Sequence, residues 1–305
     1  MNLELSTLID QLIILFTLVL IGFTATRLHL LPGQTSRILS DLVVNVTNPC
    51  AVLASVLSGA RILTNAQVLM LGLTAVGMYL VLMLLAQPLP FLLRANPQQR
   101  GVLRFMTVFP NMSFLGFPVI TALFGKESVF LASIFVLVQQ FFCYSYGTGQ
   151  LGGDSRLSWR ILLRPMILAS LLACVLYALR VEAPTLVQRT LSTLGNVTSP
   201  AAMLSIGCSL AGLPLKKVFG QWRSYAFCPV RLILSPILIW ALCFWWMPNE
   251  RMLQVTVTLA ATPAAASTVL LCTKYGGDEE IATGGVFLST LLCLITIPLI
   301  LLLLF

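Results

Sequence analysis

Charge is scarce in this sequence. Only 9% of its 305 residues are Asp, Glu, Lys or Arg, and 58% are hydrophobic, whereas a soluble globular domain carries about 25% charged residues. The deficit excludes a soluble domain and indicates an integral membrane protein. The net charge is +8, but the basic residues stand singly or in pairs between apolar runs. Such spacing is typical of topology determinants and gives no reason to expect a nucleic-acid partner.

Catalytic and metal-binding patterns are also missing. The sequence has one histidine, His29, and its eight cysteines form no CxxC pair, so we expect neither a metal site nor a disulfide framework. No Walker A, HExxH or GxSxG motif occurs, and we therefore expect no enzymatic activity and no cofactor. The N-terminus carries Glu4 and Asp10 and no small-residue cleavage site, which predicts a first span and not a signal peptide.

Long apolar runs dominate the chain instead, and they predict an all-α polytopic membrane protein. Runs of about 20 residues, the length that crosses a bilayer, occur at ten places. The predicted spans are Leu5–Thr26, Ile38–Leu57, Gln67–Ala86, Gly101–Leu123, Val129–Gly149, Ile161–Leu179, Leu191–Leu210, Ala226–Met247, Leu253–Cys272 and Ile281–Phe305. The polar stretch at 152–160 is the expected linker, and it divides the chain into repeats 1–150 and 151–305 with five spans each.

The two halves share a sequence register. NVTNPCAVL, from Asn45, matches NVTSPAAML, from Asn196, at a spacing of 151 residues, and the same spacing relates Gly125 to Gly276. An odd number of spans in each half forces the second copy to enter the membrane with opposite topology. We therefore predict two inverted five-helix repeats.

Basic residues predict the orientation. Thirteen lie in or beside the odd-numbered loops and five lie on the opposite face, namely Arg61, Lys126, Arg180, Arg189 and Arg251. Cytoplasmic loops carry the excess of Lys and Arg. This asymmetry places the odd loops in the cytoplasm and both termini outside.

Two predicted spans, the fourth and the ninth, are interrupted. The fourth contains FPNMSFLGFP (Phe109–Pro118) and the ninth contains LAATPAAAST (Leu259–Thr268). Because proline removes a backbone donor and clashes with the preceding turn, we expect Pro110 and Pro118 to open the fourth helix. Interrupted spans in corresponding halves are typical of a transport site. The candidate substrate-binding residues are Pro110, Asn111, Met112, Ser113, Thr262, Pro263 and Ala264.

Asn111 is the principal candidate, because its amide offers two donors and an acceptor beside backbone N–H groups freed by the break. The alternative is that the amide only satisfies those backbone groups. A second polar set lies in the second and seventh spans: Asn45, Thr47, Asn48, Asn196, Thr198 and Ser199. These residues either line a cavity or ion site, or repair helices kinked at Pro49 and Pro200. Arg231 is expected to snorkel to the cytoplasmic face, with carboxylate binding as the alternative.

These motifs resemble the auxin efflux carrier family, which includes plant PIN proteins and bacterial malonate and organic-acid permeases. The resemblance rests on NPCAVLASVLSG, PNMSFLGFP and the closing TPAAASTVLLCTKYGGDEEIATGGVFLSTLLCLITIPL, and it covers the whole chain. It implies that the broken fourth and ninth helices cross at the substrate site. It also implies alternating-access transport of small carboxylates, with Pro110, Asn111 and Pro263 as the matched residues of the crossover.

The resulting expectation is a secondary transporter of small organic anions, such as malonate, malate or auxin-like acids, in the inner membrane of a bacterium. The expected partners are the carboxylate and the lipid bilayer, and a homodimer is left open. Two alternatives also stay open. One is a non-transporting receptor or scaffold on the same fold, and the other is an ion-coupled symporter of a bile-acid-transporter-like type.

Overall fold

The computed structural model describes residues 5–57, 63–153, 162–212 and 220–305, with side chains from residue 10 onward. It is helical, and no strand occurs in these ranges. Six helical stretches have the length and apolar composition of membrane spans: Asp10–Arg27, Thr35–Leu57, Asn65–Leu92, Ser128–Gln150, Trp222–Cys243 and Glu279–Leu304. The predicted all-α class with several apolar spans is confirmed. The predicted linker lies almost wholly outside the described residues, as do Arg61, Arg156, Arg160, Lys216 and Lys217 of the topology count.

Packing divides the chain into two compact units, and each unit takes segments from both halves of the sequence. Unit 1 contains Met1–Gly72, Ser113–Leu137 and Trp159–Gly212, and unit 2 contains Leu73–Met112, Val138–Ser158 and Leu213–Phe305. The long helices α4 (Asn65–Ala86) and α8 (Ser128–Phe142) contribute residues to both units.

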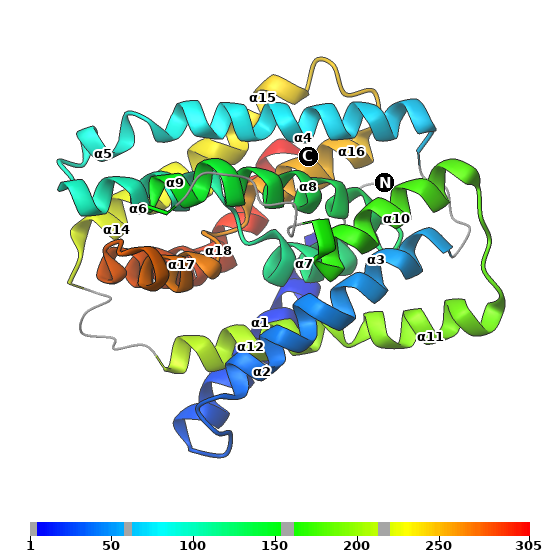
Figure 1. The fold of residues 1–305 in the computed structure, drawn as a ribbon, viewed down its shortest axis with the longest axis horizontal. Coiled ribbons are helices and arrows are strands. Elements are labelled where there is room, and N and C mark those ends of the chain that lie inside the picture. The colour runs from blue at the N-terminus through cyan, green and yellow to red at the C-terminus, as the bar shows by residue number, and fades with distance from the viewer. Residues whose placement is uncertain (1–4, 58–62, 154–161, 213–219) are drawn as a thin grey trace. The chain divides into compact units, whose positions relative to one another are not determined.

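Unit 1 is held together by close helix contacts at small residues. Its other elements are α1 (Leu5–Arg27), α2 (Thr35–Leu42), η1 (Val43–Thr47), α3 (Asn48–Leu57), α7 (Phe117–Phe124), α10 (Pro165–Leu179), α11 (Thr185–Asn196) and α12 (Thr198–Ala211). Helix α12 packs against α1 and α2 (Figure 1). A Cβ atom added to Gly207 would lie 2.1 Å from the carbonyl oxygen of Val19. Glycine therefore allows the backbones of α1 and α12 to approach directly, as small residues do between membrane helices.

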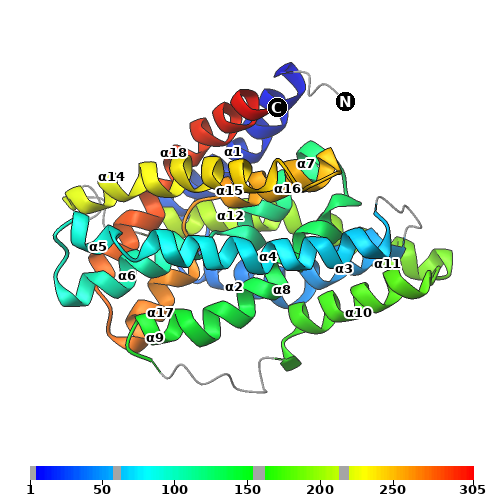
Figure 2. The same ribbon diagram turned by 90° about the horizontal axis from the view of Figure 1, so that it is seen from above.

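Unit 2 contains α6 (Pro97–Val108) and α16 (Glu250–Ala261), the helices whose C-terminal ends lie at the two breaks. Its other elements are α5 (Leu89–Leu92), η3 (Cys143–Gly147), α9 (Thr148–Gln150), α14 (Trp222–Pro229), η5 (Val230–Leu234), α15 (Ser235–Cys243), α17 (Ser267–Tyr275) and α18 (Glu279–Leu304). Helix α15 lies beside α16 (Figure 2). Asp278 caps α18 by accepting from the Ile281 N–H at 3.0 Å, and it also accepts from Gln99 Nε2 at 2.9 Å. That second bond joins the starts of α6 and α18.

Three prolines follow a π-helical turn, and the helix continues through each of them. Pro49 follows η1, Pro236 follows η5, and Pro118 follows η2 (Met112–Gly116). A proline ring clashes with the carbonyl four residues earlier, and the wider π turn relieves that clash. The expectation that Pro118 opens the fourth span is therefore wrong, because the chain is helical from Met112 to Phe124. Only the Pro110 end of the motif is open.

The seventh predicted span also differs from the observed helices. The chain forms two helices there, since α11 ends at Asn196 and α12 begins at Thr198. Pro200 lies in the first turn of α12, where a missing backbone N–H costs nothing. The proline thus marks a helix start and not a kink within one long helix.

Candidate functional site

The two open segments of unit 2 pair with each other. Helix α6 ends at Val108 and α16 ends at Ala261, and Pro110 forms an isolated antiparallel bridge with Ala264. The Asn111 N–H donates to the Pro263 carbonyl at 2.8 Å, and the Ala265 N–H donates to the Phe109 carbonyl at 2.9 Å. This pairing, residues 109–111 with 263–265, is called the crossing below. Both predicted breaks are present, but these two amides are occupied by backbone and are not free to bind an anion.

Side chains satisfy further backbone groups of the crossing. Gln139 Nε2 on α8 donates to the Pro110 carbonyl at 2.7 Å, and the Ala264 N–H donates to Ser289 Oγ on α18 at 3.2 Å. An open backbone inside a membrane protein needs such partners, because lipid supplies none. The crossing is consequently a fixed structure and not a loose loop.

Arg231 contributes the only charge recorded at the crossing among the described residues. Its side chain is 0% exposed, and its guanidinium donates to three backbone carbonyls. Nε reaches Thr262 O at 3.2 Å, Nη1 reaches Thr107 O at 3.0 Å and Nη2 reaches Ala260 O at 2.9 Å. The prediction that Arg231 snorkels to the cytoplasmic face is wrong. It joins the C-terminal ends of α6 and α16, where carbonyl groups lack helical partners and the helix dipole favours a cation.

The carboxamide of Asn111 has a different environment from its backbone. The residue is 4% exposed, and its amide side chain forms no hydrogen bond with any described residue. Phe109, two residues before it, and Met112, directly after it, are fully buried, and the hydroxyl of Tyr79 donates to Met112 Sδ at 3.4 Å. A buried polar amide without a hydrogen-bond partner among the described residues is a candidate ligand contact. The alternative, that the amide repairs the broken backbone, has no hydrogen bond to support it.

The remaining candidate residues take part in the crossing mainly through their backbone groups and not through their side chains. The Thr262 hydroxyl donates to the Leu259 carbonyl of its own helix at 2.8 Å. Pro110, Pro263 and Ala264 form the pairing itself. Ser113 belongs to unit 1, where its carbonyl accepts from Asn48 Nδ2 at 3.3 Å.

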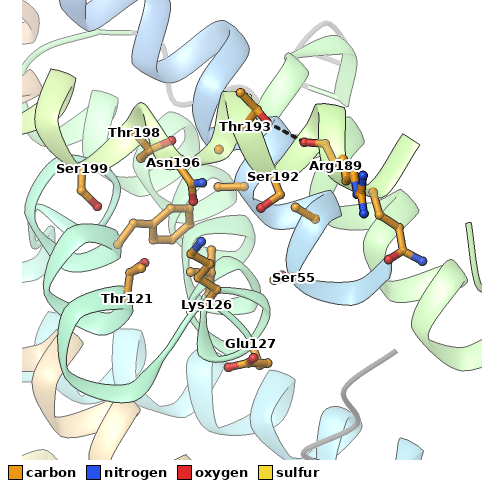
Figure 3. A pocket seen from close by; sticks show the side chains of 16 residues that line it. Ser55, Thr121, Lys126, Glu127, Arg189, Ser192, Thr193, Asn196, Thr198 and Ser199 are labelled. Atoms are coloured by element: carbon orange, nitrogen blue, oxygen red, sulfur yellow. Dashed lines mark hydrogen bonds between the residues drawn. The ribbon is translucent and has the colours of Figure 1, made fainter. Parts of the chain in front are cut away.

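Only part of the second polar set lines a cavity. Asn45 is exposed, whereas Thr47 and Asn48 are buried. Asn196, Thr198 and Ser199 instead line a cavity of about 670 Å³ within unit 1 (Figure 3). Its wall comes from α3, α7, α11, the starts of α8 and α12 and the turn between α7 and α8, and its charged members are Lys126, Glu127 and Arg189.

Sequence reasoning missed several residues of these sites. Gln139 and Ser289 give no signal beyond being single polar residues inside apolar runs, and their partners lie on other helices. Arg231 did give a signal, a cation inside a predicted span, but its side chain was assigned to the membrane surface. Lys126 and Arg189 were counted only as topology determinants.

Comparison with known proteins gives the family of this chain. The model of a family described as "Membrane transport protein" matches residues 7–152 and 154–301. The chain is 24% identical to "Uncharacterized transporter MJ1031" of Methanocaldococcus jannaschii, over 95% of this chain and 96% of that protein. It is also 24% identical to a "Putative malonate transporter" of Rhizobium meliloti, over 92% and 91% of the two chains. "Uncharacterized transporter YfdV" of Escherichia coli is 23% identical over 95% and 96%.

The family match covers nearly the whole chain, and the resemblance that the motifs indicated is confirmed. The chain belongs to this membrane transport protein family, which is the family of the auxin efflux carriers, and it is a membrane transporter and not an enzyme.

Proposed function

We propose that this transporter is a secondary carrier of small organic anions, namely carboxylates of the size of malonate or malate, and that the crossing binds them. The observation that carries the proposal is the buried Arg231. Its three hydrogen bonds go to neutral carbonyl groups, and no described carboxylate pairs with it. The Rhizobium meliloti relative that is named a malonate transporter supports the same substrate class.

Electrostatics favours an anion at this place. A charge buried inside a membrane protein is costly, and such residues mark substrate or ion pathways. Carbonyl dipoles solvate the guanidinium but leave its net positive charge in place. An anion bound near Asn111 would complete the charge balance, because Arg231 and Asn111 both attach to the same paired segments. Arg231 acts here through its field, since the carbonyl groups occupy the N–H groups that face them.

Recognition at close range falls to the Asn111 carboxamide. Its NH₂ group is a donor that suits a carboxylate oxygen. The apolar neighbours Phe109 and Met112 exclude water and strengthen that bond. The proposed site therefore combines a remote cation, one amide donor and an apolar wall.

The inverted-repeat fold that we propose would explain how the crossing serves alternating-access transport. Ten spans in two inverted repeats, 1–150 and 151–305, would place the crossing at the bilayer midplane with both termini outside. Gly125 and Gly276, which share the repeat spacing, both have positive φ, 84° and 88°, at the ends of α7 and α17. This equivalence supports the repeat. We place the protein in the inner membrane of a bacterium.

Transport of labelled malonate into proteoliposomes tests the proposal. The matched control substrate is malonamide, which keeps the size of malonate and removes both charges. We expect saturable uptake of malonate that unlabelled dicarboxylates inhibit, and no inhibition by malonamide. Equal inhibition by malonamide, or no uptake of any mono- or dicarboxylate in a panel, would contradict an anion carrier.

A further inference from the structure

The cavity of unit 1 carries two cations on its wall. Lys126 lies in the turn between α7 and α8, and Arg189 lies on α11. Neither residue forms an ion pair with any described residue. Ser192 and Asn196, also on α11, add a hydroxyl and an amide to the same wall. Figure 3 shows the Lys126 ammonium pointing toward the part of the cavity lined by Asn196. The wall thus offers positive charge and hydrogen-bond donors together.

Glu127 is the one acidic residue on this wall, and its carboxylate does not face the two cations (Figure 3). A Cβ atom added to Gly125 would lie 2.8 Å from Glu127 Oε2, so the Glu127 carboxylate folds back over the turn. In Figure 3 that carboxylate points away from Asn196 and Ser192. Gly125 has a φ of 84°, a left-handed conformation that favours glycine. The turn therefore presents Lys126 to the cavity without neutralising it.

We propose that this cavity is a second anion-binding site, which takes a small carboxylate or phosphate anion between Lys126 and Arg189. Asn196 and Ser192 donate hydrogen bonds to the bound anion, and the volume of about 670 Å³ accommodates a dianion with its water. Every lining residue belongs to unit 1, so the site shares no residue with the crossing and does not depend on the proposed function. A free dicarboxylate and the headgroup of an anionic lipid share the required chemistry.

Lysine acylation gives a direct readout, because the chain has four lysines, Lys126, Lys216, Lys217 and Lys274. The purified full-length protein in detergent is treated briefly with an acetylating reagent, and mass spectrometry measures each lysine. The probe is malonate, with sodium chloride at matched ionic strength as the control. We expect malonate to slow acetylation of Lys126 and to leave the exposed Lys274 unchanged.

Variants assign the protection to this cavity. Arg189→Gln should raise the malonate concentration that half-protects Lys126 by about two- to fivefold, the range for exposed charge pairs. The matched control, Arg37→Gln on α2, removes an exposed arginine outside the cavity wall and should change nothing. Asn111→Ala should also leave the protection intact, since Asn111 belongs to unit 2.

A second arm distinguishes the source of the anion. Vesicles of phosphatidylglycerol replace malonate, with phosphatidylcholine vesicles as the neutral control. Protection by phosphatidylglycerol without protection by malonate assigns the site to a lipid headgroup and keeps the anion chemistry. Three results overturn the proposal: protection by neither probe, equal protection by chloride, or unchanged protection in Arg189→Gln.

Discussion

At the scale of single residues, the backbone of the crossing is already bonded, so the binding that we propose there depends on side chains. The N–H groups of Asn111 and Ala265 are bonded across the pairing, and Gln139 and Ser289 bond two further backbone groups. What is left for a ligand is the Asn111 carboxamide and the field of Arg231. The two side chains have different tasks, and substitution should separate them.

Asn111→Ala should weaken substrate binding without destabilising the protein. The change removes a neutral hydrogen bond of roughly 0.5–1.5 kcal/mol, which corresponds to an affinity loss of about two- to twelvefold. Asn111→Asp should be worse, because its carboxylate repels the bound anion. Calorimetric titration with malonate and thermal unfolding are measured on the same preparations. Unchanged affinity together with a lower Tm in both variants would show that the amide serves stability only.

Arg231→Lys should lower both stability and transport, although the charge is kept. The ammonium group of lysine is a compact charge and cannot reproduce the planar fork that reaches three carbonyl groups. At least one buried carbonyl loses its donor, at a cost of about 1–3 kcal/mol. Thermal unfolding and malonate uptake measure the effect, and Arg37→Lys on the exposed face of α2 is the control. A wild-type Tm would mean that these three bonds contribute nothing.

At the scale of elements, the sequence predicts where helices break but not what the broken ends contact. Pro110 and Pro263 stand inside apolar runs, and both positions are open, because proline cannot continue the hydrogen-bond ladder. Pro118 carries the same local signal, yet the chain stays helical there, because the π turn before it relieves the clash between the proline ring and the preceding carbonyl. That difference depends on packing around the turn, which no local pattern encodes.

The side chains that bond to the crossing could not be predicted from the local sequence either. Arg231 is far along the chain from Thr107, and only tertiary structure brings the guanidinium to that carbonyl. The side-chain length of arginine permits both snorkelling and burial, so the sequence alone could not choose between them. Asn196, Thr198 and Ser199 were expected to line a cavity or ion site, or to repair a kink, and in the structure they line the cavity of unit 1.

The contact between α1 and α12 should be intolerant of even one methyl group. A Cβ at Gly207 would meet the Val19 carbonyl oxygen at 2.1 Å, so Gly207→Ala forces the helices apart, at a cost of about 1–3 kcal/mol. The matched control is Gly77→Ala on α4, where a Cβ would meet nothing within 4 Å. Thermal unfolding of both variants checks this, and an equal Tm for the two would contradict the close contact.

At the scale of the whole molecule, the charge asymmetry predicts the topology. Reporter fusions or cysteine accessibility should place Met1 and Phe305 outside and Trp159 inside, as thirteen basic residues against five require. Met1 and Trp159 lie outside the described residues, and the measurement does not depend on their structure. A cytoplasmic C-terminus would overturn both the count of ten spans and the inverted repeat.

The same scale decides how transport is driven. No acid lies in the middle of any predicted span, so the usual proton relay is missing. An anion that leaves a negative interior gains about 2.3 kcal/mol per charge per 100 mV, which suffices for uncoupled efflux. We expect malonate flux in proteoliposomes under an imposed potential with no proton or sodium gradient. Flux that requires a sodium gradient would favour the ion-coupled symporter.

The pairing of Pro110 with Ala264 also sets the order of events during synthesis. These residues are separated by about half of the chain, so the first broken helix leaves the ribosome long before its partner exists. Until then the N–H of Asn111 and the carbonyl of Phe109 lack the partners that the finished protein gives them, in a membrane that supplies no substitute. These backbone groups of the first half stay unpaired until the second half has been synthesised, and contacts between distant segments form slowly. Assembly of the crossing is therefore among the last steps of biogenesis, and a chain truncated before Pro263 cannot complete it.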